Sequence, residues 1–341
     1  MSRGVLNQRF GDIVARDSDM LQYSYRPQPP ATRRTRTDDD QSWIDYLPIT
    51  ERPPLVWPNS ARIAIWLCPN VLFYELNSAA DPWINAWSRM APDVMMYGRQ
   101  EFGPRVGFWR MLDVLDKHAI PSTAVLNVGA LRRYPDICDA IVQRRWDLLG
   151  HGMTNTRFIC GHSEDEESAH YAEILKMVRD CTGMTMAGMG GPGPQAATES
   201  TPDLLAEAGF LYYADLFHDD QPFPIRVRQG RLISMPYSVE INDVPILSTA
   251  FEGDQFLSMV KRQFDRLYAE GAQSGRVMCL AVHPHVIGQP QRTRYFDLAL
   301  AYLKSFPDVW FATGRQIAEH YLAESYDAVQ ARIAAFKESG R

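Results

Sequence analysis

The sequence has few cysteines, and they lack the pairing that holds metal ribbons and disulfide-stapled folds together. The five cysteines are an odd number, lie far apart along the chain and include no Cys-x-x-Cys pair. Neither a zinc ribbon nor a disulfide framework is therefore indicated. The reducing cytoplasm is the compartment that this cysteine usage favours.

Long apolar runs and an excess of positive charge are missing as well. No stretch approaches the ~20 apolar residues that cross a bilayer. Arg3, Arg9 and Asp12 interrupt the segment in which a signal peptide would need an apolar core. The formal net charge of −6 gives no electrostatic basis for binding nucleic acid or an anionic membrane. We expect a small-molecule substrate as the partner.

The chain does contain enough apolar material for a large core. It has 341 residues, of which 45% are hydrophobic, and this length suits a single α/β barrel domain. Residues 56–325 are expected to form that domain, followed by a helical tail over residues 326–341.

Residues 1–55 differ in composition from the rest of the chain. Proline, positive charge and negative charge follow one another closely there, so the segment can bury little surface. We expect an extended or partly disordered arm. The alternative is an arm laid over a neighbouring subunit, with Trp43, Tyr46 and Leu47 as its anchors.

From Arg62 onward, short apolar runs alternate with segments of helical periodicity. A continuous apolar run is typical of a strand that is buried on both faces, as in a parallel sheet. Alternating strands and helices predict such a sheet, and this many units suggest closure into a barrel. The predicted strands are 63–68, 122–126, 147–149, 212–215, 232–235, 277–282 and 309–311, and the predicted helices are 106–118, 135–145, 164–181, 202–208, 253–271, 295–305 and 314–321.

Polar side chains follow most of these strands. In α/β barrels the reacting groups lie just beyond the carboxyl ends of the strands, so these positions are the candidates for a site. Histidines and acids gather there more consistently than a random scatter would. In chain order the candidates are Asn70 and Glu75, His151 and Asn155, Asp215 and Asp220, Tyr237 and Asn242, and His283 and His285.

His151 and His283 are the foremost of these candidates. His151 stands between Gly150 and Gly152, so a tight backbone presents its ring without bulky neighbours; the alternative is a histidine tied into a turn. His283 follows the most apolar predicted strand, and an imidazole there can pass a proton to a leaving amine. His285 is either its neighbour in the site or a loop residue.

Two further positions have a plain structural alternative. Arg105 begins a predicted helix, where a positive charge opposes the helix dipole, and this suggests a carboxylate or carbonyl partner. Asn242 precedes Asp243 and Pro245, which could equally form a simple turn.

Six segments of the chain, in this order, resemble the polysaccharide deacetylase-like family, most closely its allantoinase-like and cyclic-imide-hydrolysing branch. The resemblance implies a distorted (β/α) TIM-like barrel, hydrolysis of carbon–nitrogen bonds other than peptide bonds, and homo-oligomers, either dimers or tetramers. The matching segments are 97–110, 150–152, 191–192, 219–222, 236–243 and 283–290.

The same resemblance exposes departures from the family pattern. Metal-binding members carry acids after the first strand, where this chain has Asn70 and Leu72. They also space their zinc histidines as His-x-x-x-His, and the second position here is Asn155, a poor zinc ligand. His151 alone remains of that ligand set. A site without a cofactor is therefore favoured, with a divalent metal such as zinc as the alternative.

Amide hydrolysis needs an activated water, a stabilised oxyanion and a proton for the departing nitrogen. The hypothesis is that Arg105 or Asn155 holds the carbonyl of a small amide, imide or ureide, either cyclic or open. His151, Asp215 or Glu75 then activates water, and His283 protonates the nitrogen. Asn70, Tyr237, Asn242, Asp220 and His285 are the further candidates for binding substrate.

Two other functions compete with this hypothesis. The replaced acids after the first strand allow a barrel recruited for lactone or carbon–carbon bond hydrolysis, or for a non-hydrolytic step on a carbonyl compound. A binding protein without catalysis is the third alternative, and the retained histidines 151 and 283 disfavour it.

Overall fold

A computed structural model describes residues 43–76, 92–192, 197–244 and 252–339. Residues 1–42, the larger part of the predicted arm, lie outside the described residues. Trp43–Arg341 forms one compact unit. Among the described residues no helix is long and apolar enough to cross a membrane.

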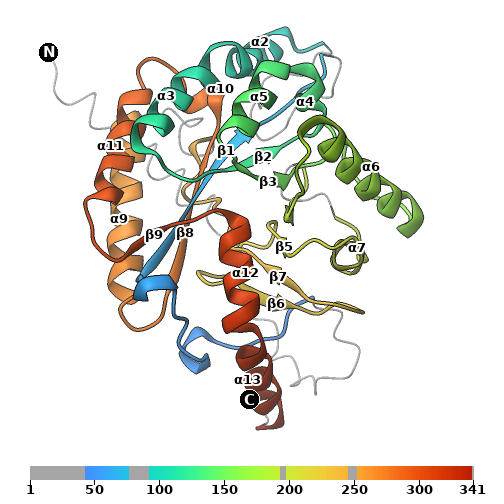
Figure 1. Ribbon diagram of the computed structural model, residues 1–341, viewed down its shortest axis with the longest axis vertical. Coiled ribbons are helices and arrows are strands. Elements are labelled where there is room, and N and C mark those ends of the chain that lie inside the picture. Colours follow the sequence, from blue (N-terminus) through green and yellow to red (C-terminus); the bar gives the residue numbers. More distant parts are fainter. Residues whose placement is uncertain (1–42, 77–91, 193–196, 245–251, 340–341) are drawn as a thin grey trace, which may run out of the picture. The chain divides into compact units, whose positions relative to one another are not determined.

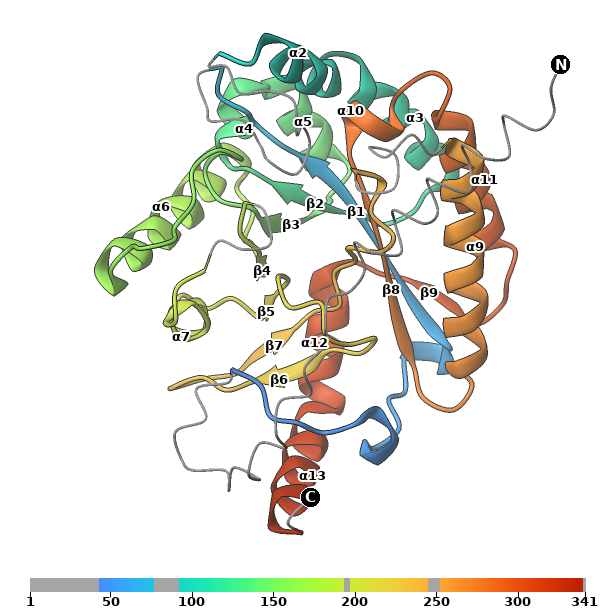
Figure 2. The ribbon, with the colours of Figure 1, turned by 180° about the vertical axis from the view of Figure 1, so that it is seen from behind.

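A curled, mostly parallel sheet forms the core of this unit (Figures 1 and 2). Its longest strand, β1 (Ile63–Val71), is buried along its whole length and pairs in parallel with β8 (Arg276–Val282). On the other side, β1 pairs with β9 (Val309–Phe311) near its start and with β2 (Thr123–Leu126) near its end. Because burial on both faces removes polar alternation, these strands are the continuous apolar runs of the sequence.

The sheet continues from β2 through short strands to an antiparallel edge. Its further members, in spatial order, are β3 (Asp147–Gly150), β4 (Gly188–Met189), β5 (Tyr212–Tyr213), β7 (Leu232–Ser234) and the antiparallel β6 (Phe223–Ile225). This arrangement is a distorted α/β barrel of the expected class. Strand β6 was not predicted, because three residues that include Pro224 are too short and irregular to show a strand period.

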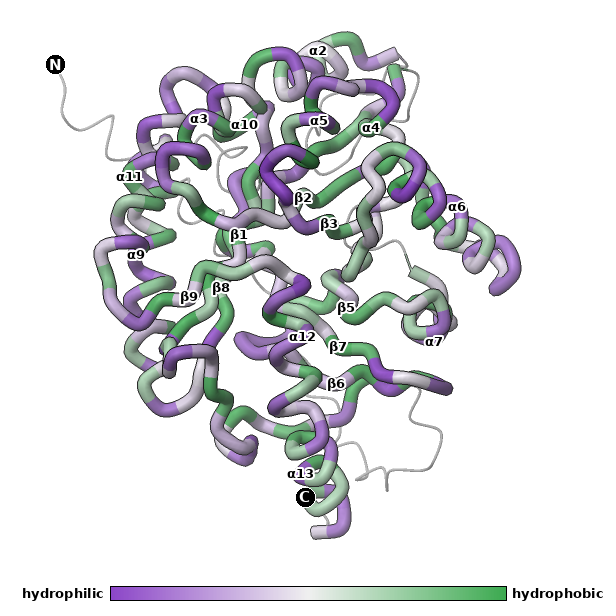
Figure 3. Tube along the Cα trace, in the orientation of Figure 1, coloured by the Kyte–Doolittle hydropathy of each residue, from purple (hydrophilic) through white to green (hydrophobic). Residues whose placement is uncertain are grey.

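Helices cover the outside of the sheet. Figure 3 shows hydrophobic and hydrophilic residues alternating along outer helices such as α9, the pattern of a helix with one buried face. Figures 1 and 2 show α9 and α11 side by side along β8. The helices are α2 (Val94–Phe102), α3 (Phe108–His118), α4 (Gly129–Arg133), α5 (Pro135–Gln143), α6 (Glu164–Thr182), α7 (Thr201–Glu207), α9 (Gly253–Glu270), α10 (Pro284–Ile287), α11 (Thr293–Lys304), α12 (Gly314–Glu324) and α13 (Tyr326–Glu338), with short 3-10 turns at Ile49–Glu51 and Pro58–Ser60.

A π-helical turn, η3 (Gly103–Gly107), joins α2 to α3 and packs against α10. A Cβ atom on Gly107 would lie 2.0 Å from the Pro284 carbonyl oxygen, and one on Gly103 would lie 3.2 Å from the His285 nitrogen. Only glycine allows so close an approach of two backbones. Turn η3 therefore fixes the position of the loop that carries His283 and His285.

The described end of the arm packs on its own chain. Trp43 donates its indole N–H to the Glu199 carbonyl at 3.1 Å and meets the Tyr213 ring edge-on at 6.3 Å. Leu47 is buried in the core, and the ring of Tyr46 lies against Phe336. Contacts within the same chain therefore cover Leu47 and part of Trp43, whereas Tyr46 is 62% exposed. An arm laid over a neighbouring subunit stays the alternative.

Candidate active site

The loops after β3 and β8 bring two of the candidate histidines to one place. His151 follows β3, and its backbone N–H donates to the Leu126 carbonyl at 2.8 Å, which fixes it at the carboxyl end of the sheet. Burial, assisted by the nearby charge of His283, lowers the pKa of His151 to about 3. The two histidines thus share an electrostatic environment, and His151 is neutral over the physiological pH range.

His283 is held by a buried carboxylate. Its Nδ1 lies 2.7 Å from Oδ1 of Asp243, and its backbone N–H donates to Oδ2 of the same side chain at 2.8 Å. Asp243 is fully buried, and His283 is 7% exposed. A carboxylate at Nδ1 fixes the ring orientation and the tautomer, and it stabilises a proton carried by the imidazole. This pairing leaves Nε2 as the nitrogen for proton transfer.

Asp243 was not among the predicted site residues. It reaches His283 because the segment before it lies along β8: Asn242 forms a bridge with Ala281, and the Ala281 N–H donates to the Ile241 carbonyl at 3.3 Å. Asn242 itself caps a turn, accepting the Val244 N–H at 3.1 Å. The sequence allows a turn at this dipeptide, and no local signal reveals that the second residue faces a histidine 40 positions away.

Asn127 is another residue that the sequence did not reveal. It is fully buried, accepts the Phe73 N–H at 3.0 Å and donates its amide to the His151 carbonyl. One side chain thereby connects the loops that follow β1 and β3. Its role is to position the backbone on either side of His151.

Asn70 and Tyr237 form a connected pair at the end of β1. Asn70 is 3% exposed; its amide nitrogen donates to the Cys68 carbonyl at 3.0 Å, and its oxygen accepts the Tyr237 hydroxyl at 3.2 Å. Burial raises the pKa of Tyr237 well above its usual range, so its hydroxyl keeps its proton. Both polar ends of Asn70 are therefore engaged within the protein.

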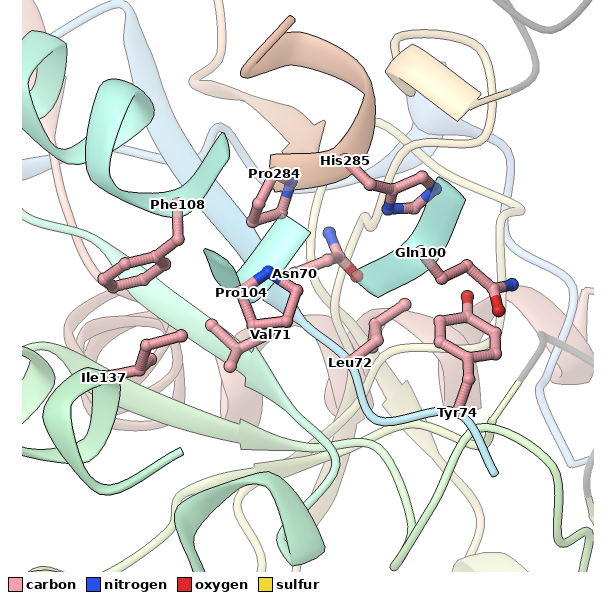
Figure 4. A pocket seen from close by; sticks show the side chains of 10 residues that line it. All are labelled: Asn70, Val71, Leu72, Tyr74, Gln100, Pro104, Phe108, Ile137, Pro284 and His285. Atoms are coloured by element: carbon pink, nitrogen blue, oxygen red, sulfur yellow. The ribbon is translucent and has the colours of Figure 1, made fainter. Parts of the chain in front are cut away.

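A small pocket opens beside Asn70 (Figure 4). In this view the polar side chains of Asn70, Tyr74, Gln100 and His285 gather on one side, whereas the opposite side is apolar. The apolar side consists of Val71, Pro104, Phe108, Ile137 and Pro284, and Leu72 lies beside Tyr74. The ring of His285 is 5.7 Å from that of His283, centroid to centroid, so the pocket adjoins the His283–Asp243 pair. Sites for small ligands commonly combine an apolar wall with few polar groups in this way.

Asp215, which follows β5, lies beneath the loop after β4. Its Oδ2 accepts the Gly191 N–H at 2.6 Å, and a Cβ atom on Gly190 would lie 2.8 Å from its Oδ1. Burial raises the pKa of Asp215 to about 7, although the bonds from Gly191 and Tyr213 favour the ionised form. The same loop approaches His151, because the Gly190 N–H donates to the Gly150 carbonyl at 2.8 Å.

Glu75 lies on the loop after β1 and Asn155 on the loop after β3, and the Asn127 side chain is hydrogen-bonded to both loops. Oxygens of Glu75 accept from the Arg157 guanidinium at 2.7 Å and the Thr156 hydroxyl at 2.8 Å, and these bonds lower its pKa. The Asn155 backbone N–H donates to the Phe73 carbonyl at 2.8 Å. Its side-chain oxygen is buried and has no hydrogen-bond partner among the described residues.

Two predicted site residues lie away from this group. The Arg105 side chain is 67% exposed and pairs at 3.1 Å with the buried Glu101, which is therefore the carboxylate partner expected from its helix position. The Asp220 carbonyl accepts the Val277 N–H at 2.9 Å, at the start of β8. His283 follows the far end of that strand, roughly 20 Å away at the usual strand rise. The structure therefore does not bring Asp220 to the histidines.

Comparisons with known proteins agree with the fold described above. No family model matches the chain. A "Putative polysaccharide deacetylase" from Schizosaccharomyces pombe is 25% identical over 296 residues, which cover 79% of this chain and 92% of that protein. The crystal structure of Puue allantoinase superposes with a TM-score of 0.71 at 27% identity, covering 84% of this chain and 99% of that one. The chain resembles the polysaccharide deacetylase-like family.

A second solved structure supports the polysaccharide deacetylase-like assignment. The probable polysaccharide deacetylase from Pseudomonas aeruginosa PAO1 has a TM-score of 0.70 and 26% identity, and it covers 80% of this chain and 95% of that one. Near-complete coverage of the relatives places the whole barrel, rather than one motif, within the resemblance. The short segments quoted from the sequence therefore indicated the same family as these comparisons.

The side chains present here do not fit the metal site expected for metal-dependent members of the polysaccharide deacetylase-like family. Within the described ranges, no three His, Cys, Asp or Glu side chains converge as metal ligands. Asn70 is bonded to the Cys68 carbonyl and the Tyr237 hydroxyl, and Leu72 has no donor atom. Zinc sites of the catalytic type need three protein ligands. We therefore derive no reaction step through a metal.

Proposed function

We propose that this protein hydrolyses a carbon–nitrogen bond in a small amide, imide or ureide. The observation that carries the proposal is the His283 ring, which the buried Asp243 holds at Nδ1 and whose charge acts on His151, the residue after β3. Cleaving such a bond requires a proton for the departing nitrogen, and a positioned imidazole is the usual donor. The resemblance to a polysaccharide deacetylase and to an allantoinase supports the reaction class.

His283 is the general acid in this proposal. Its Nε2 donates a proton to the leaving nitrogen, and the Asp243 carboxylate at Nδ1 holds the ring in the orientation for that transfer. Asp243 touches no reacting atom and acts by positioning the ring, through its bonds to the side chain and the backbone of His283. Fixing both the ring and its backbone keeps the donor in one geometry at low entropic cost.

Asp215 is the best-supported base among the three candidates. A carboxyl group with a pKa of about 7 is substantially ionised at neutral pH and still basic enough to take a proton from water. His151, with its pKa near 3, holds a proton too weakly for this purpose and serves as a neutral hydrogen-bonding group. Glu75 is engaged by Arg157 and Thr156, which favour its unreactive anion.

The Asn155 side chain is the candidate for holding the substrate carbonyl. An amide nitrogen on a fixed loop can donate to the oxygen on which negative charge develops, without rearranging during the reaction. The Asn155 side-chain oxygen is buried and has no hydrogen-bond partner among the described residues. It can therefore accept a hydrogen bond from an N–H of the bound substrate. The pocket beside Asn70 is small, which favours a compact substrate over a polymer chain.

A substrate panel tests this proposal. Cyclic imides, open and cyclic ureides, simple amides and N-acetyl sugars would be incubated with the wild-type protein and with His283→Ala, and the released amine or acid quantified. Hydrolysis of at least one class by the wild type, and a loss of about 10²-fold or more in the variant, is the expected result. Equal rates for the two proteins, or no hydrolysis of any class, would overturn it.

A further inference from the structure

Two buried polar side chains of the pocket beside Asn70 take no part in the reaction outlined above. Gln100 is in the last turn of α2 and His285 is in α10, and both line the pocket. Gln100 is 9% exposed and His285 is 5% exposed. Figure 4 shows the two side chains on the same side of the pocket, opposite its apolar side. Polar groups placed in this way usually orient a ligand and decide which ligand is bound.

Turn η3 fixes the backbone from which each of these side chains extends. The Gly103 N–H donates to the Gln100 carbonyl at the end of α2. A Cβ atom on Gly103 would lie 3.2 Å from the His285 backbone nitrogen and 3.3 Å from the His285 Cβ. The ring of His285 is also 5.7 Å from that of His283, centroid to centroid. A ligand group held by Gln100 and His285 is therefore close to the proposed general acid.

The polar ends of Gln100 and His285 are available to a ligand. The backbone carbonyl of His285 accepts the Gln289 amide at 3.2 Å. Neither the His285 ring nor the Gln100 amide has a hydrogen-bond partner within the part of the chain that the structure describes. Burial lowers the pKa of His285 well below its usual range, so its ring is neutral. A neutral imidazole offers one donor and one acceptor, and a glutamine amide offers two donors and an acceptor.

The pocket contains no side chain that could pair with a charged ligand, as far as the described residues go. Apart from apolar residues, its lining consists of asparagine, glutamine, tyrosine and neutral histidine. A carboxylate that entered such a pocket would lose its hydration without gaining an opposite charge. An uncharged amide loses less, because Gln100 and His285 can replace its hydrogen bonds to water. The pocket therefore favours an amide group over a carboxylate.

We propose that Gln100 and His285 bind a second, uncharged amide group of the substrate, and that Gln100 sets the preference for such a substrate. The substrate class is then a small neutral diamide, in which a few bonds separate the amide that is cleaved from the amide that is held. A glutamine amide can pair with another amide by donating one hydrogen bond and accepting another. The carbon chain between the two amides lies against the apolar side of the pocket, which includes Phe108 and Pro284. This inference rests on the proposed function, because it names the substrate class of that site.

Three probes with the same carbon chain test the proposal. Succinamide carries two amides, succinamate has a carboxylate in place of one amide, and dimethyl succinate has no N–H group. Ligand-observed NMR titrations would measure the affinity of each probe for the wild type and for Gln100→Met, Gln100→Glu and His285→Phe, and the same spectra would show any hydrolysis. Gln143→Met is the matched control, because Gln143 is exposed at the end of α5 and does not line the pocket. Circular dichroism of each variant checks that it is folded.

The wild type and Gln143→Met are expected to bind succinamide more tightly than either of the other probes. Gln100→Met removes the amide and His285→Phe removes both ring nitrogens. Each should therefore weaken succinamide binding about fivefold or more, with little change for dimethyl succinate. Gln100→Glu replaces the donor by a negative charge, so it should weaken the binding of succinamide and of succinamate.

The comparison of the three probes on the wild type needs no variant and can overturn the proposal by itself. No binding of succinamide, or an affinity for succinamate or dimethyl succinate equal to that for succinamide, would do so. Wild-type affinity in the folded Gln100 variants, or an equally large effect of Gln143→Met, would also contradict it. Failure of the proposed function has a different signature. In that case succinamide binding still depends on Gln100, but no member of the substrate panel is hydrolysed and His283→Ala changes no rate.

Discussion

At the scale of single residues, burial determines what the ionisable groups of this site can do. The same loss of water that keeps His151 neutral, with a pKa of about 3, raises the pKa of Asp215 to about 7. Desolvation disfavours the charged form of any group, so it lowers the pKa of a base and raises that of an acid. Opposite shifts in neighbouring groups are typical of sites in which one group accepts a proton and another stays neutral.

Replacing Asp243 by asparagine tests the positioning of His283. The asparagine amide could keep one hydrogen bond, but the substitution removes the negative charge beside Nδ1 and favours the wrong tautomer. We expect kcat on the best panel substrate to fall by about 10²-fold or more, with a small change in KM. Circular dichroism and thermal unfolding would show that the variant is folded. An unchanged kcat would mean that Asp243 has only a structural role.

The pH dependence of kcat/KM tests Asp215 as the base. The carboxylate is the active form of Asp215, so kcat/KM should rise as the pH increases through about 7. Asp215→Asn preserves an acceptor for the Gly191 N–H and should remove that limb together with most of the activity. An identical acidic limb in this variant would assign the titration to another group.

A further prediction at this scale concerns the dependence of activity on a metal. Since the described side chains offer no three converging ligands, activity should survive dialysis against a chelator. Elemental analysis before and after dialysis, with the activity measured in parallel, checks this. Stoichiometric zinc whose removal abolishes activity, and whose return restores it, would contradict the prediction and require ligands from another part of the chain.

At the scale of elements, the contact between η3 and α10 aligns the site. Gly107 and Gly103 allow the π-helical turn to lie directly on the loop that begins with His283. Single π-turns are often found at functional sites, where they redirect a helix. This contact also gives a structural reason for Gly103 and Gly107 within the segment 97–110.

Gly107→Ala is expected to destabilise the protein by about 1–3 kcal/mol and to lower activity, because its Cβ would lie 2.0 Å from the Pro284 carbonyl oxygen. Gly98→Ala is the matched control: it lies in α2 with no atom within 4 Å of its Cβ. Alanine favours helix, so the control should be neutral or slightly stabilising. Urea unfolding of both variants measures the difference, and equal stability would contradict the packing argument.

At the scale of the whole molecule, exposed apolar side chains bear on assembly. A homo-oligomer is expected from the family resemblance, and several apolar side chains are exposed on α2 and nearby, including Val94 and Met95 at 68% each and Trp109 at 37%. Apolar surface of this kind often marks a contact between subunits. Light scattering coupled to size-exclusion chromatography should give a dimer or a tetramer. A monomer at micromolar concentration would contradict this expectation.

Much of the barrel could be predicted from the sequence because its long strands are buried on both faces. The apolar runs 63–68 and 277–282 correspond to β1 and β8, and Ser163 caps α6 as expected. Short elements were harder: α2 was not predicted, and β6 has three residues and an antiparallel direction. Elements of that size are stabilised by their neighbours more than by their own residue pattern.

The sequence by itself determined the fold class, the family resemblance and which strand ends carry His151 and His283. The apolar periodicity and the succession of strands and helices along the chain are local properties of the sequence. Only the tertiary structure decided that Asp243 pairs with His283, that Arg105 faces solvent and that Asp220 lies at the opposite end of β8. These are contacts between segments far apart in the chain. They depend on how loops turn at the sheet's two ends, which no local pattern encodes.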